Sequence, residues 1–294
     1  MAHPFPPTLL VGHFSAPSSH RRWAAVALLA GVFVVSGCST WRASDPNAPV
    51  AQRIESLLPA DVLLLGEQHD APEHQALQRE SVEALSARGQ LAALAMEMAE
   101  AGRSTARLPA SASESQVRSA LSWNDKAWPW QAYGPVVMTA VRAGVPVLGA
   151  NLPRARMKDA MTDVSLDVQL NEKALAAQRT AVRDGHCGLL PESQIEPMTR
   201  IQIARDREMA HTAAQAVKPG RTVLLVVGSA HADKALGVPQ HLPTELRVRS
   251  VGLVAGDARS TGYDGIWRTP ALPAKDYCAA VKPAAGASPQ APAR

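Results

Sequence analysis

The sequence has little net charge, few cysteines and no apolar run of transmembrane length. Its formal net charge is +4, of which Arg21 and Arg22 supply two charges, and this excludes the strongly basic surface expected of a nucleic-acid-binding protein. The apolar run at 24–35 is shorter than the roughly 20 residues that a membrane-spanning helix needs. Only three cysteines are present, so the chain can form no more than one intramolecular disulfide.

The N-terminal region has the order of a secretory signal. The basic residues Arg21 and Arg22 precede the apolar run, and small residues follow it directly before Cys38. The sequence Val35-Ser-Gly-Cys38 is similar to a lipobox, so we expect cleavage before Cys38 and acylation of this cysteine. The alternative is an ordinary secretory signal that has a chance cysteine at its end.

Lipidation predicts a protein of the cell envelope that is anchored in a membrane through Cys38. Ser39 follows the cysteine, and the outer membrane, facing the periplasm, is the expected location. The remainder of the chain is long enough for one large domain with an ample apolar core. The predicted parts are a lipoprotein signal peptide at 1–37, a tether at 38–50, an α/β domain at 51–281 and a disordered, Pro- and Ala-rich tail at 282–294.

Cys187 and Cys278 remain once Cys38 is assigned to the anchor. In an oxidising compartment such a pair can form a disulfide. The alternative is two buried free thiols, because sequence does not show whether the two Cα atoms come within bridging distance.

Short apolar runs alternate with longer helical segments along the domain. Runs of this length suit strands that are buried on both faces, and the intervening segments suit crossover helices. The sequence therefore predicts an α/β fold, a single domain with a largely parallel central sheet flanked by helices. The predicted strands are 61–66, 91–98, 145–151, 222–228 and 247–254.

Two helices have predicted starts. Asp70 is expected to cap a helix whose first turn contains Pro72 and which ends near Gly89. A longer helix at 193–217 is expected to begin with a capping box in Ser193-Gln-Ile-Glu196. One face of the longer helix, made by Gln202, Arg205, Asp206 and Met209, either supports a functional site or packs an ion pair against the sheet.

Charged and ionisable residues follow several of the predicted strands. Glu67 and His69 come after the first, Glu97 closes the second, and His231 follows the strand at 222–228. Ligands of open α/β sheets bind outside the carboxyl ends of the strands. We therefore expect these four side chains, together with Asn151 after another strand, to line one crevice.

Each of the two histidines ends a Gly-x-x-His segment, at Gly66–His69 and at Gly228–His231. The glycine is expected to allow a tight turn at the strand exit without a Cβ clash, so that the histidine three residues on faces the site. Two histidines with two glutamates can bind a divalent metal, with Glu67, His69 and His231 as ligands, or can act in acid–base catalysis. Alternatively, the histidines donate to the carboxylates and only hold the strand ends together.

Several motifs resemble those of one known family. Leu64-Leu-Gly-Glu-Gln-His-Asp70, with Leu77-Gln-Arg79, resembles the opening motif of the ChaN family of haem-binding lipoproteins, and Gly228-Ser-Ala-His-Ala232 resembles its later motif. This family belongs to the wider Tiki and erythromycin-esterase superfamily. The resemblance extends roughly from Ala51 to Cys278. Further segments look like family motifs in family order, at 128–135, 149–154, 186–188, 202–210 and 237–242.

The resemblance implies an iron-related lipoprotein in which a homodimer encloses two stacked haems, with a tyrosine as iron ligand and a histidine nearby. No Cys-x-x-Cys-His sequence is present, so any haem must be held by side-chain ligation and apolar contact. Tyr133 is the expected ligand, because Trp128 and Trp130 beside it can contact a flat porphyrin; a half-buried structural tyrosine is the alternative. His186 is the candidate histidine, unless it simply faces solvent.

Three functions from different classes follow from these patterns. A haem-binding cell-envelope lipoprotein in iron or haem uptake is favoured. The alternative is a metal-dependent hydrolase in which Glu67, His69, Glu97 and His231 activate water. The third is a non-catalytic envelope protein with a vestigial crevice, and the sequence leaves open whether the chain is an enzyme. The expected partners are haem, a membrane through the lipid anchor, and a second copy of the chain.

Overall fold

The computed structural model describes residues 48–258 and 260–279. The predicted signal peptide, Cys38 and the predicted tail at 282–294 lie outside these residues. Within the described part of the chain, no helix combines the length and the hydropathy that crossing a membrane requires.

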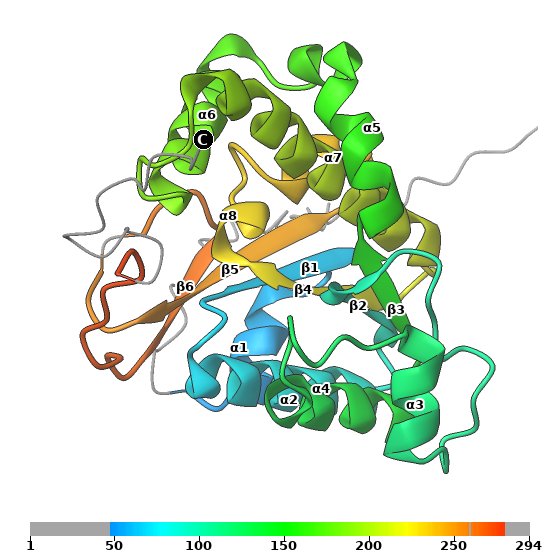
Figure 1. Ribbon diagram of the computed structural model, residues 1–294. Helices are drawn as coiled ribbons and strands as arrows, with labels where there is room; N and C mark the ends of the chain where they lie inside the picture. The colour runs from blue at the N-terminus through cyan, green and yellow to red at the C-terminus, as the bar shows by residue number, and fades with distance from the viewer. Residues whose placement is uncertain (1–47, 259, 280–294) are drawn as a thin grey trace, which may run out of the picture. The chain divides into compact units, whose positions relative to one another are not determined.

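The described residues contain one sheet of six parallel strands, in the order β3-β2-β4-β1-β5-β6 (Figure 1). The predicted α/β fold with a parallel central sheet is thereby confirmed. The strands at the centre are β1 and β4, and every residue of both is buried. The bounds are β1 Val62–Glu67, β2 Leu91–Glu100, β3 Val147–Asn151, β4 Thr222–Gly228, β5 Val248–Ala255 and β6 Gly265–Thr269.

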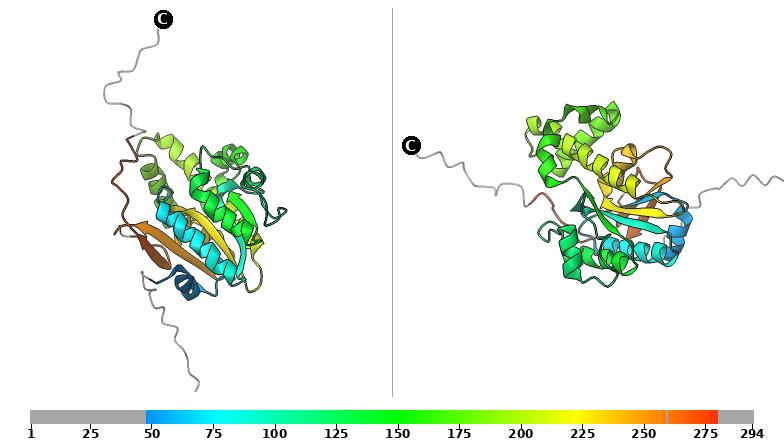
Figure 2. Two further views of the ribbon diagram at one scale, coloured as in Figure 1. Left: turned by 90° about the horizontal axis from the view of Figure 1, so that it is seen from below. Right: turned by 90° about the vertical axis from the view of Figure 1, so that its right-hand side faces the viewer.

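Successive side chains of a strand point to opposite sides of the sheet, so each buried strand contributes apolar residues to both faces. Leu63 and Leu65 of β1 belong to one hydrophobic cluster, whereas Val62 and Leu64 belong to the other. The first cluster lies under α1 (Val50–Leu57), α2 (Pro72–Ala87), α3 (Glu114–Leu121) and α4 (Trp130–Arg142). Figure 2 shows α2 and α4 side by side against this face.

The opposite face carries the remaining helices. The long helix α7 (Glu192–Ala216) packs on this face through Met209 and Ala213, and α8 (Ser229–Ala232) follows β4 directly (Figure 1). The shorter elements beside them are η1 Arg154–Arg156, α5 Met157–Thr162, η2 Val164–Val168, α6 Glu172–Gly185 and η3 Val238–His241.

Two predicted helix caps were wrong. Helix α2 has Ala71 as its N-cap and no side-chain cap, because Asp70 lies one residue too early and contacts Lys275 and Tyr277 instead. Helix α7 begins at Glu192, before the predicted cap, and has no side-chain cap hydrogen bond. Ser193 is therefore already inside the helix, where it cannot take the extended conformation of an N-cap.

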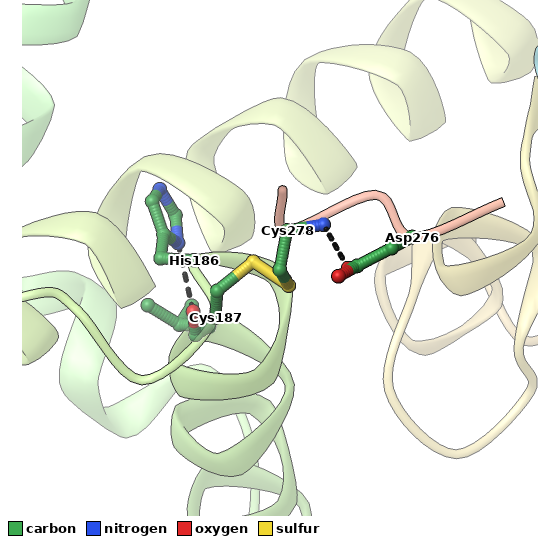
Figure 3. The surroundings of a disulfide bond; sticks show 5 residues. His186, Cys187, Asp276 and Cys278 are labelled. Atoms are coloured by element: carbon green, nitrogen blue, oxygen red, sulfur yellow. Dashed lines mark hydrogen bonds between the residues drawn. A yellow bond between two sulfur atoms is a disulfide. The ribbon is translucent and has the colours of Figure 1, made fainter. Parts of the chain in front are cut away.

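After β6 the chain continues to Cys278 through residues 270–276, which form neither helix nor strand. Cys278 is bonded to Cys187 in the turn after α6, with a Cα–Cα distance of 5.7 Å (Figure 3). The structure therefore contains the disulfide and not the two free thiols. This bond joins positions that are 91 residues apart in the sequence.

Candidate functional site

The four residues predicted to line a crevice lie at the carboxyl edge of the sheet. Glu67 is the last residue of β1, Glu97 lies near the end of β2, and His231 is on α8 just after β4. Strands β1 and β4 are paired so that Glu67 is opposite Gly228. The sequence alternation of strands and helices produces this convergence, because all the strands run in the same direction.

The carboxylate of Glu67 is buried, with 1% of the residue exposed. His69 Nδ1 lies 2.7 Å from its Oε1, and the Tyr133 hydroxyl donates to the same oxygen at 2.5 Å. Gln75 and Gln78 of α2 donate to Oε2. Four donors from a loop and two helices therefore compensate this buried charge, which would otherwise be costly.

His69 is the accessible member of the group. Its side chain is 43% exposed, and its ring makes an edge contact with Trp128 at a centroid distance of 4.9 Å. Burial lowers the pKa of His69, but the hydrogen bond with Glu67 and the charge of Glu97 outweigh it and raise the pKa. An imidazole at the surface, with an indole beside it, suits a ligand that has a flat apolar body and polar groups at its edge.

His231 lies in a second, buried cluster. Its Nδ1 is 2.6 Å from Asp206 Oδ1, and its Nε2 is 3.6 Å from Glu97 Oε1. Burial lowers the pKa of His231, but the two carboxylates outweigh it and raise the pKa to about 9. Burial raises the pKa of Asp206 to about 6, although His231 opposes this shift. The pair is therefore charged at neutral pH.

Glu97 connects the two clusters. Its Oε2 accepts a hydrogen bond from the backbone N–H of Gly228 at 2.7 Å. Burial raises the pKa of Glu97, but His231 and His69 lower it more, so the net pKa is lowered. The carboxylate thus stays ionised while it is only 3% exposed.

Asp206 is a site residue that sequence reasoning placed only on a helix face with Gln202, Arg205 and Met209. The structure directs its carboxylate at His231, while its Oδ2 is buried with no hydrogen-bond partner among the described residues. Asp206 thus contacts a predicted site residue, and the same contact is an ion pair buried beside the sheet. The helical spacing indicated a shared face, but the contact itself depends on where α7 crosses the sheet.

The two Gly-x-x-His segments pack against each other. A Cβ added to Gly66 would lie 2.6 Å from Ala232 Cβ, and one added to Gly228 would lie 3.0 Å from His69 Nε2. Neither glycine is among the residues with positive φ. The predicted absence of a Cβ clash at these glycines agrees with this packing, and the clash that they avoid is between the two segments.

The predicted metal ligands Glu67, His69 and His231 are close together but do not surround a common point. His231 directs both ring nitrogens at Asp206 and Glu97, and His69 Nδ1 is held by Glu67. Across residues 48–258 and 260–279, no group of three or more His, Cys, Asp or Glu side chains is arranged to hold a metal ion. The geometry does not favour the hydrolase alternative.

Tyr133, the predicted iron ligand, lies inside the domain. It is 1% exposed, and its hydroxyl points to Glu67. Burial and the charge of Glu67 raise its pKa far above the usual range. Trp130 is likewise buried, with its Nε1 donating to Glu114. In this arrangement Tyr133 braces Glu67, and its oxygen does not face a ligand.

A different tyrosine lies at the surface of the site. Tyr277 is 54% exposed, and its hydroxyl lies 3.0 Å from Asp70 Oδ2 and 2.9 Å from Gln68 Nε2. These two partners flank His69 in the sequence. No sequence signal singled out Tyr277, because the disulfide and the long-range path of the chain after β6 bring it here.

His186 lies in the turn after α6, next to the disulfide (Figure 3). It is half-buried, and its Nδ1 donates to the carbonyl oxygen of Val182 at 2.7 Å. Its described hydrogen bonds do not involve the carboxylates of the site. Through the bond between Cys187 and Cys278 it is nevertheless close along the chain to Tyr277.

Comparison with known proteins agrees with this fold. A family model described as "Haem-binding uptake, Tiki superfamily, ChaN" matches residues 53–242. A solved structure that shows cofacial heme binding to ChaN of Campylobacter jejuni is 24% identical, with a TM-score of 0.63, and the match covers 73% of this chain and 89% of that chain. At this identity the likeness shows a shared fold.

The type III effector HopBA1 is a more distant neighbour. It is 14% identical over 80% of this chain and 100% of that chain, and the TM-score of 0.43 is too low to support an argument. No curated protein matches the sequence.

Proposed function

The chain belongs to the ChaN family of haem-binding uptake proteins in the Tiki superfamily, and from that premise we propose that it binds haem beside His69. The observation that carries this proposal is the family match, which covers the site from Glu67 through His231. His69 and Trp128 supply an exposed imidazole and an indole at this edge. Such groups can receive the propionates and the apolar face of a porphyrin.

Tyr277 is the tyrosine we propose as the iron ligand, in place of Tyr133. Haem would supply an iron centre when bound, and a phenolate oxygen would be a suitable ligand for its ferric state. The Tyr277 hydroxyl is at the surface, beside the loop that carries His69. Tyr133 would have to leave Glu67 before it could meet iron. His186 remains the proposed neighbouring histidine, because it adjoins the disulfide that carries Tyr277.

Hemin titration of the purified full chain tests this proposal. The unsubstituted protein should give a Soret band and the charge-transfer absorption of a tyrosinate–iron bond. Tyr277→Phe should remove that absorption and weaken hemin binding by about tenfold or more. Tyr133→Phe should keep the spectrum, and Tyr263→Phe is the matched control, because its hydroxyl donates to the Ser229 carbonyl oxygen.

Two outcomes would contradict the proposal in different ways. Failure of the unsubstituted protein to bind hemin would overturn the haem function. Loss of the absorption in Tyr133→Phe alone would show that the buried tyrosine turns outward and that Tyr277 is misassigned.

We further propose that the protein is a lipoprotein of the cell envelope, anchored through Cys38 and facing the periplasm from the outer membrane, where it takes part in iron or haem uptake. The secretory order of residues 1–37 and the Cys187–Cys278 disulfide support an oxidising compartment. Cys38→Ala should give a protein without acyl mass that leaves the membrane fraction. An unchanged acyl mass on the substituted protein would refute the anchor.

A homodimer is the proposed assembly in the haem-bound state. The proposal is supported by the cofacial heme binding reported for ChaN of Campylobacter jejuni. Light scattering during hemin titration should show the mass doubling as one haem is taken up per chain. A monomer at saturating hemin would refute this assembly without affecting haem binding itself.

A further inference from the structure

Residues 270–279, which we call the C-terminal strap, are fixed to the domain at both ends. One end continues from β6, and the other is bonded through Cys278 to Cys187. Two side chains of the strap contact the same acceptor: Lys275 Nζ and the Tyr277 hydroxyl each lie 3.0 Å from Asp70 Oδ2. The strap therefore connects the α6–α7 turn with the loop that holds His69.

The polar contacts of the strap are exposed. The side chains of Lys275 and Asp70 are 59% and 37% exposed, and Tyr277 is 54% exposed. Contacts of this kind are screened by solvent and hold two segments together only weakly. The disulfide keeps the strap near Asp70 and so maintains a high effective concentration of these weak contacts.

The strap does not cover His69. Gln68 and Asp70, which flank His69, both bond to Tyr277, yet the His69 side chain remains 43% exposed. The strap thus braces the loop in a conformation that is open to a ligand. These contacts favour binding, because a loop that is already ordered loses less conformational entropy when the ligand binds.

We propose that the Cys187–Cys278 disulfide is a redox-sensitive device that sets haem affinity by holding Tyr277 and the Gln68–Asp70 loop in place; this inference rests on the proposed haem site. A dithiol reductant breaks the Sγ–Sγ bond with two electrons and two protons. Each sulfur becomes a thiol, and the dithiol is oxidised to a disulfide. Both cysteines are partly exposed, so an attacking thiolate can reach them.

The test compares oxidised full chain with chain that has been reduced and alkylated, so that no thiolate can bind iron. A double variant, Cys187→Ser with Cys278→Ser, provides the same opening without reagents. Oxidised chain treated with the alkylating reagent alone is the matched control, because it meets the same reagent and keeps the disulfide intact. Two quantities are measured: amide hydrogen exchange at 68–70 without hemin, and the hemin dissociation constant.

Opening the disulfide should speed exchange at 68–70 and weaken hemin binding by about threefold to tenfold, as expected when the competent loop state becomes a minor fraction. The control should match the oxidised chain. Unchanged exchange and affinity, or tighter binding after reduction, would overturn the inference. If the oxidised chain binds no hemin, the proposed function fails and the affinity claim with it, while exchange still shows whether the disulfide holds the loop.

Discussion

The two Gly-x-x-His segments have the same spacing and follow neighbouring strands, but their histidines lie in different environments. The side chain of His69 is 43% exposed and contacts Trp128, whereas that of His231 is 10% exposed and lies between two carboxylates. Helix α7 causes the difference, since it brings Asp206 against His231. The same motif therefore provides one histidine that faces solvent and one that is buried in an ion-paired cluster.

The largest effect should come from breaking the buried pair. Asp206→Ala leaves a cationic His231 without its main partner, and removal of one member of a buried ion pair costs about 3–5 kcal/mol of unfolding free energy. Asp70→Ala is the exposed counterpart and should cost less than about 1 kcal/mol. Urea unfolding of both variants gives the comparison. Similar losses of unfolding free energy in the two variants would contradict the distinction between a buried and an exposed ion pair.

The pH dependence of stability should reveal the same pair. The pKa of His231 is raised from 6.5 to about 9, and that of Asp206 from 3.8 to about 6. Both groups thus hold a proton more tightly in the folded state, so the unfolding free energy falls as pH rises through each interval. The contribution of His231 is fully present below pH 6.5 and is lost by about pH 9, a change of up to about 3 kcal/mol.

Urea unfolding at pH 6.5 and at about pH 9 measures this loss of unfolding free energy. His231→Gln is the reference, because it cannot titrate there, and the unsubstituted protein should lose more stability than the variant. Parallel profiles for the two proteins would contradict the charged pair.

The two glycines should differ in the opposite sense to the two histidines, because Gly66 faces the buried Ala232 after β4 and Gly228 faces the exposed ring of His69. Gly66→Ala places a Cβ 2.6 Å from Ala232 Cβ and 3.1 Å from the backbone of Ser229, and we expect a cost of about 2–3 kcal/mol, since overpacked cores relax poorly. Gly228→Ala meets the exposed ring of His69, which can move, and should cost about 1 kcal/mol. Thermal unfolding checks the order, and the reverse order would mean that His69 is held as firmly as the core.

The smallest effects should separate the two tyrosines. Tyr133→Phe removes one of the four donors of Glu67 and should cost about 1.5 kcal/mol of unfolding free energy. Tyr277→Phe should change that quantity by less than about 0.5 kcal/mol, although it is expected to have the larger effect on hemin. Chemical denaturation without hemin measures both. A larger stability loss in Tyr277→Phe would show that this tyrosine is structural.

Local patterns predicted most of the fold. The apolar runs that became β1, β2, β3, β4 and β5 are visible because strands buried on both faces need continuous apolar residues. Strand β6 was missed, since it is half-exposed at the sheet edge and mixes Gly265 and Arg268 with Ile266 and Trp267. The two cap predictions failed because a shift of one or two residues decides whether a side chain reaches the helix N-terminus.

The sequence by itself determined which residues meet at the carboxyl edge of the sheet. Parallel strands all end on one side, so Glu67, Glu97 and His231 share that edge, and the strand order β2-β4-β1 makes them neighbours. The tertiary structure alone decided which histidine is covered, because the position of α7 is set by packing over the whole sheet face. It also decided that Tyr133 points inward and that Tyr277 contacts Gln68 and Asp70 in the loop that carries His69. The disulfide that places Tyr277 there joins residues 91 positions apart, and no local pattern specifies a contact of that range.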